Sequence, residues 1–503
     1  MSRLTKNIIY NTAGQGLVLI LSLIAVRFIF RRLGDDVFGI IFFNLVLTAV
    51  LTSILELGVS STLVREVSIH DDSEPAYIRD LIRTASFVYW AGGFFLVAVI
   101  WFAAPILVTH WVNLKTLDPN TATTILRILS VVSLVALPKG LYTSIFRGRQ
   151  RMGINNVIDV GTAALQQTIT LMILLTVGGV YLVAAGISAA NIVGIIAYVL
   201  VAARLFGWST LVPKFSAYVI RRNLGFTGRM TFVSVLILIH LQAAQVIVSK
   251  LLPIAQFGLY GFVSSTVNRA TIVTGAVAQA AFPSFSSLLR AGDRTQLMSQ
   301  YRKLQDVLVY GTVPLFAGVC FLAIPVYKYV FNPEVAWLLL IPTAWLALGT
   351  YMNGAASIPY MFAIASGRPD IPLMQMLLAL IIVLPVTVIL ILQFGIAGAG
   401  FSWVFYQLLN FSYMIPRISR ECLRIPLREW YAHFARALAW ALATYGLAWI
   451  AIAVPTGYSL VGLVIAYILG SIGFAIGALF LIGPDLKGTL RKLPVLRASP
   501  IQL

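Results

Sequence analysis

The sequence has little charge for its length. Only 11% of its 503 residues are Asp, Glu, Lys or Arg, whereas 59% are hydrophobic. A soluble chain carries charge on about a quarter of its residues, and these side chains are needed to cover its surface. The shortage argues against a string of soluble domains. It predicts an all-α membrane protein with nearly all of its chain in or against a lipid bilayer.

Several kinds of functional residue are also scarce. The two cysteines, Cys320 and Cys422, lie far apart, so the sequence offers no disulfide framework. The four histidines have no metal-binding spacing. A Walker A motif, a nucleophile triad order and a long outer loop for a catalytic site are all missing. We therefore expect no enzyme activity, no catalytic residues, no metal and no cofactor.

The charge that is present is mostly positive, with a formal net charge of +19. In a soluble protein this would suggest a nucleic-acid partner. Here the basic residues stand between apolar runs, where Lys and Arg set membrane orientation and contact anionic lipid. We therefore expect membrane lipids as partners and no nucleic acid.

Apolar runs of about 20 residues, the length that crosses a bilayer, recur along the whole chain. They predict about fourteen transmembrane helices. The first follows Arg3 and Lys6 and is too long for a signal-peptide core, so we interpret it as a retained helix. The predicted spans are Ile8–Phe30, Phe38–Leu63, Leu81–Leu107, Thr124–Phe146, Asn155–Val177, Tyr181–Ala203, Phe226–Leu252, Tyr260–Phe282, Gln305–Val330, Val335–Ile364, Ile371–Gln393, Ile396–Ile418, Tyr431–Val454 and Ser459–Ile482.

Basic residues gather in alternate loops between these spans. With a cytoplasmic N-terminus, the inner segments hold clusters such as Arg147, Arg149 and Arg151, whereas the outer ones hold few bases. Positive charge marks the cytoplasmic side. The pattern predicts a multi-pass protein of the plasma (inner) membrane with both termini in the cytoplasm.

Two short motifs repeat at one offset. Phe38-Gly39 recurs as Phe257-Gly258, and Gly148-Arg149 recurs as Gly367-Arg368, in both cases 219 positions later (257 − 38 and 367 − 148). The repeat predicts six-helix lobes at 1–216 and 217–430, followed by an extra helix pair and tail at 431–503. Two repeats with even helix numbers are related by a pseudo-two-fold axis along the membrane normal, and a binding cavity is expected between them.

Five segments resemble one family. They are Asn11–Gly14, Arg32–Gly39, Leu55–Val59, Val64–Glu66 and Phe146–Met152. They look like the corresponding parts of Wzx-type flippases of the multidrug/oligosaccharidyl-lipid/polysaccharide exporter superfamily. The resemblance implies transport of a polyprenyl-diphosphate-linked oligosaccharide from the cytoplasmic to the outer leaflet by alternating access, with other polysaccharide-assembly proteins as partners.

Two other functions stay open at this point. A multidrug or organic-cation antiporter would have the same fold, although its cavity should hold acids rather than arginines. A membrane-embedded polysaccharide polymerase or ligase belongs to a different class, and the short outer loops argue against it.

Basic residues inside the spans are candidates for binding the diphosphate, because an ionisable group within a membrane usually faces a wet cavity or a partner. Arg269, beside Asn268, lies well inside the eighth span, where its guanidinium would hold two phosphate oxygens. The alternative is a structural pair with Glu56 or with backbone carbonyls. Arg27 either lines the cavity mouth or reaches the outer headgroups, and Arg65 is either a site residue or an interfacial anchor.

Three further ionisable residues are candidates for coupling to H⁺ or Na⁺. Glu56 is the acid nearest the apolar interior of the first lobe, and burial would favour its protonated form. Asp159 lies toward the cytoplasmic end of the fifth span. His240, in the middle of the seventh span, is either a proton relay or a partner in an interhelical hydrogen bond.

Overall fold

The computed structural model describes residues 18, 20–56, 58–70 and 73–490. Positions 8–17 and 19 of the first predicted span, the motif Asn11–Gly14, and basic residues at both ends (Arg3, Lys6, Arg491, Lys492 and Arg497) lie outside these residues. The described part of the chain is 89% helical and contains no strand. The contacts divide it into two compact units, Met1–Leu259 and Tyr260–Leu503.

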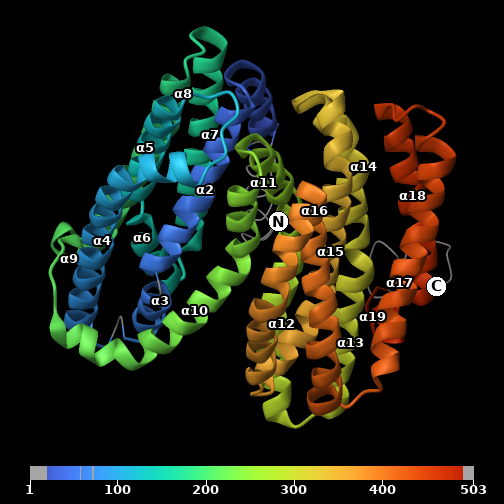
Figure 1. The fold of residues 1–503 in the computed structure, drawn as a ribbon. Helices are drawn as coiled ribbons and strands as arrows, with labels where there is room; N and C mark the ends of the chain where they lie inside the picture. Colours follow the sequence, from blue (N-terminus) through green and yellow to red (C-terminus); the bar gives the residue numbers. More distant parts are fainter. Residues whose placement is uncertain (1–17, 19, 57, 71–72, 491–503) are drawn as a thin grey trace. The chain divides into compact units, whose positions relative to one another are not determined.

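The first unit is built from long helices joined by short turns (Figure 1). It begins with a helical segment at 20–33. The helices that follow are α2 (Asp35–Glu56), α3 (Val59–His70), α4 (Pro75–His110), α5 (Pro119–Val135), α6 (Lys139–Gly148), α7 (Met152–Thr176), α8 (Val180–Phe206), α9 (Trp208–Leu211), α10 (Ala217–Leu251) and α11 (Ile254–Arg269). The last helix, α11, continues past Leu259 into the second unit.

The second unit has the same character. In it α15 packs along α14 and α16, and α17 packs along α18. Two π-helical segments, η1 (Ile418–Leu423) and η2 (Trp449–Ala453), extend α16 and α17. Its other helices are α12 (Thr271–Ala291), α13 (Arg294–Gly311), α14 (Val313–Val330), α15 (Pro333–Ala365), α16 (Asp370–Arg417), α17 (Leu427–Ala448), α18 (Leu460–Leu481) and α19 (Pro484–Leu490).

Local sequence sets several helix ends. Asp118 precedes α5, and its side chain accepts a hydrogen bond from the Thr121 amide. Asn332 does the same for α15. In both cases proline is the next residue, where its fixed φ suits the first helical turn and its missing N–H costs nothing. The predicted spans leave short gaps after Val177 and after Gln393, and a glycine with positive φ stands in each, Gly178 and Gly395.

Twelve stretches of the described chain are long and apolar enough to cross a membrane. Their surfaces carry large exposed apolar side chains, such as Phe102 at 75% and Phe480 at 78% exposure, which in a soluble protein would be a liability. The all-α, multi-pass membrane class is therefore confirmed. The count of fourteen stays a prediction, because the first span is only partly described and one stretch, Asp370–Leu423, contains two predicted spans.

Four predicted spans are not continuous helices. We expected one helix across each, and this was wrong, since each is divided between two helices. Proline explains one break directly. Pro138 stands between the end of α5 at Val135 and the start of α6, and it has no N–H to continue the helical hydrogen-bond ladder. Gly58, with φ of +72°, explains another. The divided spans are Phe38–Leu63, Thr124–Phe146, Tyr260–Phe282 and Gln305–Val330.

The repeated Phe-Gly motifs meet inside the first unit. A Cβ added to Gly258 would lie 2.8 Å from the Gly39 Cα, and one added to Gly39 would overlap the Ile254 carbonyl. Phe43 and Phe257 stack edge to face beside them, with ring centroids 6.3 Å apart. Only glycine allows α2 and α11 to approach this closely. The assignment of lobes to 1–216, 217–430 and 431–503 stays a prediction.

Candidate functional site

A basic residue begins the inner part of the divided fourth span. Pro138 is the N-cap of α6, so Lys139 is the first residue of that helix. The Lys139 Nζ lies 2.7 Å from the Asp159 Oδ1, and the Tyr198 hydroxyl donates to the same oxygen at 2.8 Å. Both charged side chains are half exposed, at 47% and 42%. The break in the helix thus places a half-exposed ion pair within a predicted membrane span.

Glu56, at the end of α2, packs against the same turn. Its carboxylate lies so close to Gly140 that a Cβ there would overlap Oε1. The ring of the buried residue Tyr89 also lies beside Gly140, because the same added Cβ would be 3.0 Å from its Cε1. The positive charges that act on the Glu56 carboxylate come from Arg147 and Lys139. α6 therefore carries two bases between two acids on neighbouring helices.

Arg269 is placed differently from our expectation of a residue within an unbroken helix. It is the last residue of α11, and α12 begins at Thr271. The negative end of a helix dipole favours a cation there. Its side chain is exposed, and no carboxylate pairs with it among the residues described in the second unit. The neighbouring Asn268 is also exposed, and its carbonyl accepts the Thr271 hydroxyl at 2.6 Å.

The other predicted site residues differ in their exposure and in their contacts. Arg27 is half-buried in the helical segment 20–33. Arg65 is exposed on α3, with its Nη1 3.0 Å from the Glu66 Oε1. His240 is half-buried in the middle of α10. Because Glu56 and Arg269 belong to different units, a pair between them is not tested, and the roles of all seven predicted residues stay predictions.

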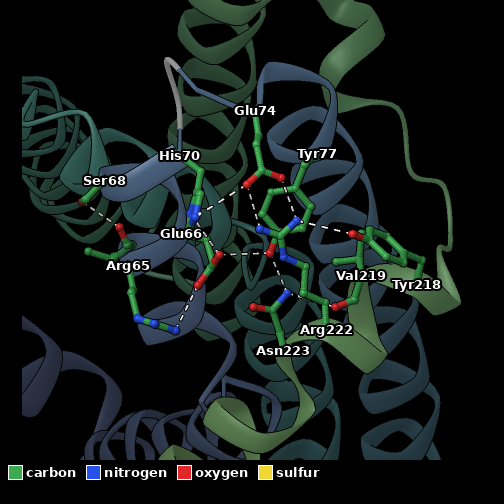
Figure 2. A network of polar contacts seen from close by, with 11 residues as sticks. Arg65, Glu66, Ser68, His70, Glu74, Tyr77, Tyr218, Val219, Arg222 and Asn223 are labelled. Atoms are coloured by element: carbon green, nitrogen blue, oxygen red, sulfur yellow. Dashed lines mark hydrogen bonds and ion pairs between the residues drawn. The ribbon is translucent and has the colours of Figure 1, made fainter.

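A polar network at the predicted cytoplasmic end of the first unit joins α3, α4 and α10 (Figure 2). Glu66 is buried at 4% exposure. One oxygen faces Arg65, and the other accepts the Tyr77 hydroxyl at 3.1 Å and lies 3.3 Å from the His70 Nδ1. Asn223 of α10 donates to the Tyr77 oxygen at 2.8 Å. A buried acid thus connects three helices.

The outer part of the network is a two-pronged ion pair. Arg222 donates to both oxygens of Glu74, at 2.7 and 2.9 Å, and its guanidinium carbon lies 3.8 Å from the centre of the Tyr77 ring. These hydrogen bonds hold the pKa of the Glu74 carboxyl below its ordinary value and raise the pKa of Arg222. The pair fastens the start of α10, the helix that leads toward the second unit, to the beginning of α4.

Acid should weaken this fastening. A carboxyl with a lowered folded-state pKa stabilises the fold above its unfolded value of 4.5, and this contribution is lost as the pH falls through the lower folded value. Glu74→Gln should reduce the Tm at neutral pH by only about 1–2 °C, since the pair is exposed. The difference should shrink as the pH falls below 4.5 and through the lowered folded-state pKa, because protonated Glu74 is then as neutral as the Gln variant. The measurement is thermal unfolding of the full chain in nanodiscs. Arg222→Gln serves as the matched partner change, and an unchanged difference at low pH would contradict the assignment.

The comparisons with known proteins decide the family. The family model described as "Polysaccharide biosynthesis protein" matches residues 4–289, more than half of the chain. The chain belongs to the polysaccharide biosynthesis protein family. A Shigella flexneri member named "Putative O-antigen transporter" is 19% identical over 406 residues, which cover 79% of this chain and 93% of that protein.

Solved structures show the fold of this family member. The lipid II flippase MurJ, in an inward closed conformation, has a TM-score of 0.70 at 15% identity and covers 94% of this chain and 98% of its own. An inward-facing multidrug resistance MATE transporter of the MOP superfamily has a TM-score of 0.65 at 13% identity, with coverages of 80% and 95%. The family match confirms the resemblance to polysaccharide biosynthesis proteins that was drawn from the sequence motifs.

Sequence reasoning missed part of the charged framework. Lys139 stands in an apolar run just after a proline, and that signal would have identified it. Glu66 was included only as part of a family motif. The Glu74–Arg222 pair spans 148 positions, and nothing local in the sequence indicates it.

Proposed function

We propose that this protein is a flippase that moves a polyprenyl-diphosphate-linked oligosaccharide from the cytoplasmic to the outer leaflet of the inner membrane. The observation that carries the proposal is a basic side chain at a helix break within a predicted span of each unit, Lys139 in the first and Arg269 in the second. Such groups suit a diphosphate, because charge-assisted hydrogen bonds to phosphate are strong. The names of the Shigella relative and of MurJ support this substrate class.

The proposed mechanism is alternating access. The headgroup enters from the cytoplasm. Arg269 of the second unit is one candidate to bind two phosphate oxygens, through the planar fork of its guanidinium. Lys139 of the first unit is another, which would exchange part of its contact with Asp159 for phosphate. Helix breaks in transporters commonly form the binding site while the two repeats rock around it. Glu56, Asp159 or His240 would take up H⁺ or Na⁺ if the cycle is ion-coupled, and removal of product outside is the other driving force.

An apolar cavity in the second unit suits the lipid tail. It has a volume of about 500 Å³ and lies among α14, α15 and α17. Aromatic side chains from all three line it, including Phe316, Trp345 and Tyr445. An isoprenoid chain is an apolar ligand, and burying its surface is favourable by about 25 cal/mol per Å². We infer that the extra helix pair supplies one wall of a groove for the polyprenyl chain.

Filling this groove should weaken substrate binding. Ala441→Trp places an indole among the lining residues, and we expect the apparent KM for a long-chain polyprenyl substrate to rise about tenfold, since several buried CH₂ groups of the tail are displaced. Ala435→Trp, at an exposed site on the same helix outside the lining, should change it little. The measurement is flipping of long- and short-chain substrates in proteoliposomes. An equal effect on both chain lengths would reject a tail site.

The first test of the proposed function is transport itself. Purified full-length protein in proteoliposomes should move a fluorescent polyprenyl-diphosphate oligosaccharide to a leaflet where a membrane-impermeant quencher reaches it. The antiporter alternative predicts ion-driven efflux of an organic cation instead, but the acid Asp159 is already engaged by Lys139 and Tyr198. The polymerase or ligase alternative predicts longer or transferred glycans. Either outcome without flipping would replace our proposal.

A further inference from the structure

A second cavity, of about 310 Å³, lies in the second unit between α13, the beginning of α17 and the end of α18. It is separate from the residues proposed to bind the transported diphosphate. Its walls belong to the cytoplasmic ends of three predicted spans, Gln305–Val330, Tyr431–Val454 and Ser459–Ile482. By the predicted topology, the cavity is therefore at the level of the inner leaflet headgroups.

A buried acid holds the cavity together. Asp306 is 4% exposed. Its Oδ1 lies 2.7 Å from the His433 Nε2, and its Oδ2 accepts the Gly483 amide at 2.8 Å. Both carboxylate oxygens are thus occupied by groups from α17 and from the turn after α18. Asp306 fixes the extra helix pair to α13 and is not available to a ligand.

The lining also contains two arginines, Arg302 and Arg436, which differ in their partners. Arg302 lies 3.8 Å from Glu429, so these two side chains balance each other. Arg436 donates from Nε to the Ala432 carbonyl at 3.1 Å. Within the described residues it takes part in no ion pair. Arg302, Glu429 and Arg436 all line the cavity, so Arg436 supplies a guanidinium there that no described carboxylate contacts.

Buried hydrogen-bond donors stand beside this charge. Tyr301 and Trp430 both line the cavity and are each 3% exposed. Although the indole lies beside the phenol, neither the Tyr301 hydroxyl nor the Trp430 Nε1 completes a hydrogen bond in the part of the chain that is described. The Gln305 Oε1, an acceptor in the same lining, also has no hydrogen-bond partner among the described residues. Buried polar groups are nearly always paired, so a donor-rich set of this kind indicates an anionic ligand.

We propose that this cavity binds a phosphate group, held by Arg436, Tyr301 and Trp430. Its position at the inner membrane surface favours the headgroup of an anionic phospholipid over free phosphate. Apolar side chains in the same lining, Met298 and Ile425, would contact the upper part of the lipid. A bound lipid would then bridge α13 and α17, the first helix of the extra pair, next to the Asp306 contact.

The test is retention of phosphatidylglycerol by the full-length protein, measured by native mass spectrometry after transfer from mixed micelles. Arg436→Gln should weaken retention about tenfold, because it removes the charge-assisted hydrogen bonds. Arg428→Gln removes an exposed arginine from the same helix but outside the cavity, and it should retain the lipid as the wild type does. If both variants lose it equally, or neither does, the proposal is overturned.

Two further arms make the result specific. Trp430→Phe keeps the ring packed against Phe411 and Phe434 while removing only the N–H, and it should lower retention several-fold even if Arg436→Gln folds poorly. Inorganic phosphate added to protein in neutral lipid tests the free ion. Stabilisation of wild type but not Arg436→Gln by phosphate alone would identify the free ion as the ligand. Full retention by Trp430→Phe would remove the indole from the site.

Discussion

Replacing Arg269 by alanine should reduce flipping of a polyprenyl-diphosphate oligosaccharide about ten- to hundredfold, because hydrogen bonds to a charged group contribute about 1.5–3 kcal/mol each. Arg269 is exposed at the end of α11, and no described carboxylate of its unit competes for it. The guanidinium is therefore available to two phosphate oxygens at once. The measurement is the initial flipping rate in proteoliposomes containing equal amounts of protein.

Two companion variants separate a binding role from a structural one. Arg269→Lys keeps the charge but loses the planar fork, so it should lie between wild type and alanine. Arg290→Ala changes an exposed arginine near the other end of the adjoining helix α12 and should flip normally. Equal flipping by Arg269→Ala and wild type would remove Arg269 from the site. A lowered Tm in Arg269→Ala would instead indicate a structural partner.

The second large effect is expected at Lys139. Lys139→Met should reduce flipping about tenfold or more, because it removes the one base at the α6 break whose ammonium directly contacts an acid of the site. Folding should be little affected, since Asp159 keeps its hydrogen bond from Tyr198 and is 42% exposed. The assay is the same flipping measurement, with circular dichroism and Tm as controls for the fold.

Asp159→Asn distinguishes anion binding from ion coupling at the same pair. If Lys139 binds phosphate, neutralising Asp159 removes a competing anion, and flipping at low substrate concentration should persist or increase. If Asp159 carries the coupling proton or Na⁺, flipping should become independent of the ion gradient or stop. A normal rate in Lys139→Met together with loss in Asp159→Asn would assign the pair to coupling and contradict a phosphate role for Lys139.

The local features of the fold could be predicted from the sequence. Apolar length alone indicated a helical membrane protein, since a helix must satisfy its own backbone within lipid. Gly178 and Gly395, which stand in the short gaps between predicted spans, have the positive φ of a turn. The helix breaks at Pro138 and Ala270 were missed, because proline is often tolerated within membrane helices and no local signal stands at Ala270.

The candidate site was only partly predictable. Glu56 and Asp159 were singled out because charge within an apolar run is conspicuous. Lys139, which pairs with Asp159, was overlooked although the same criterion applies to it. That Asp159 pairs with Lys139 and Tyr198, 20 and 39 positions away (159 − 139 and 198 − 159), depends on which face each helix turns to its neighbours.

By itself the sequence determined that this chain lies in a membrane, where most of its helices run, and which family it belongs to. These follow from composition, run length and short motifs, which are local properties. Only the tertiary structure decided which charges are neutralised. Asp306 meets His433 across 127 positions and Glu74 meets Arg222 across 148. Such pairs form when helices pack at a particular rotation and depth, and the apolar surfaces that set this packing are nearly uniform along the sequence.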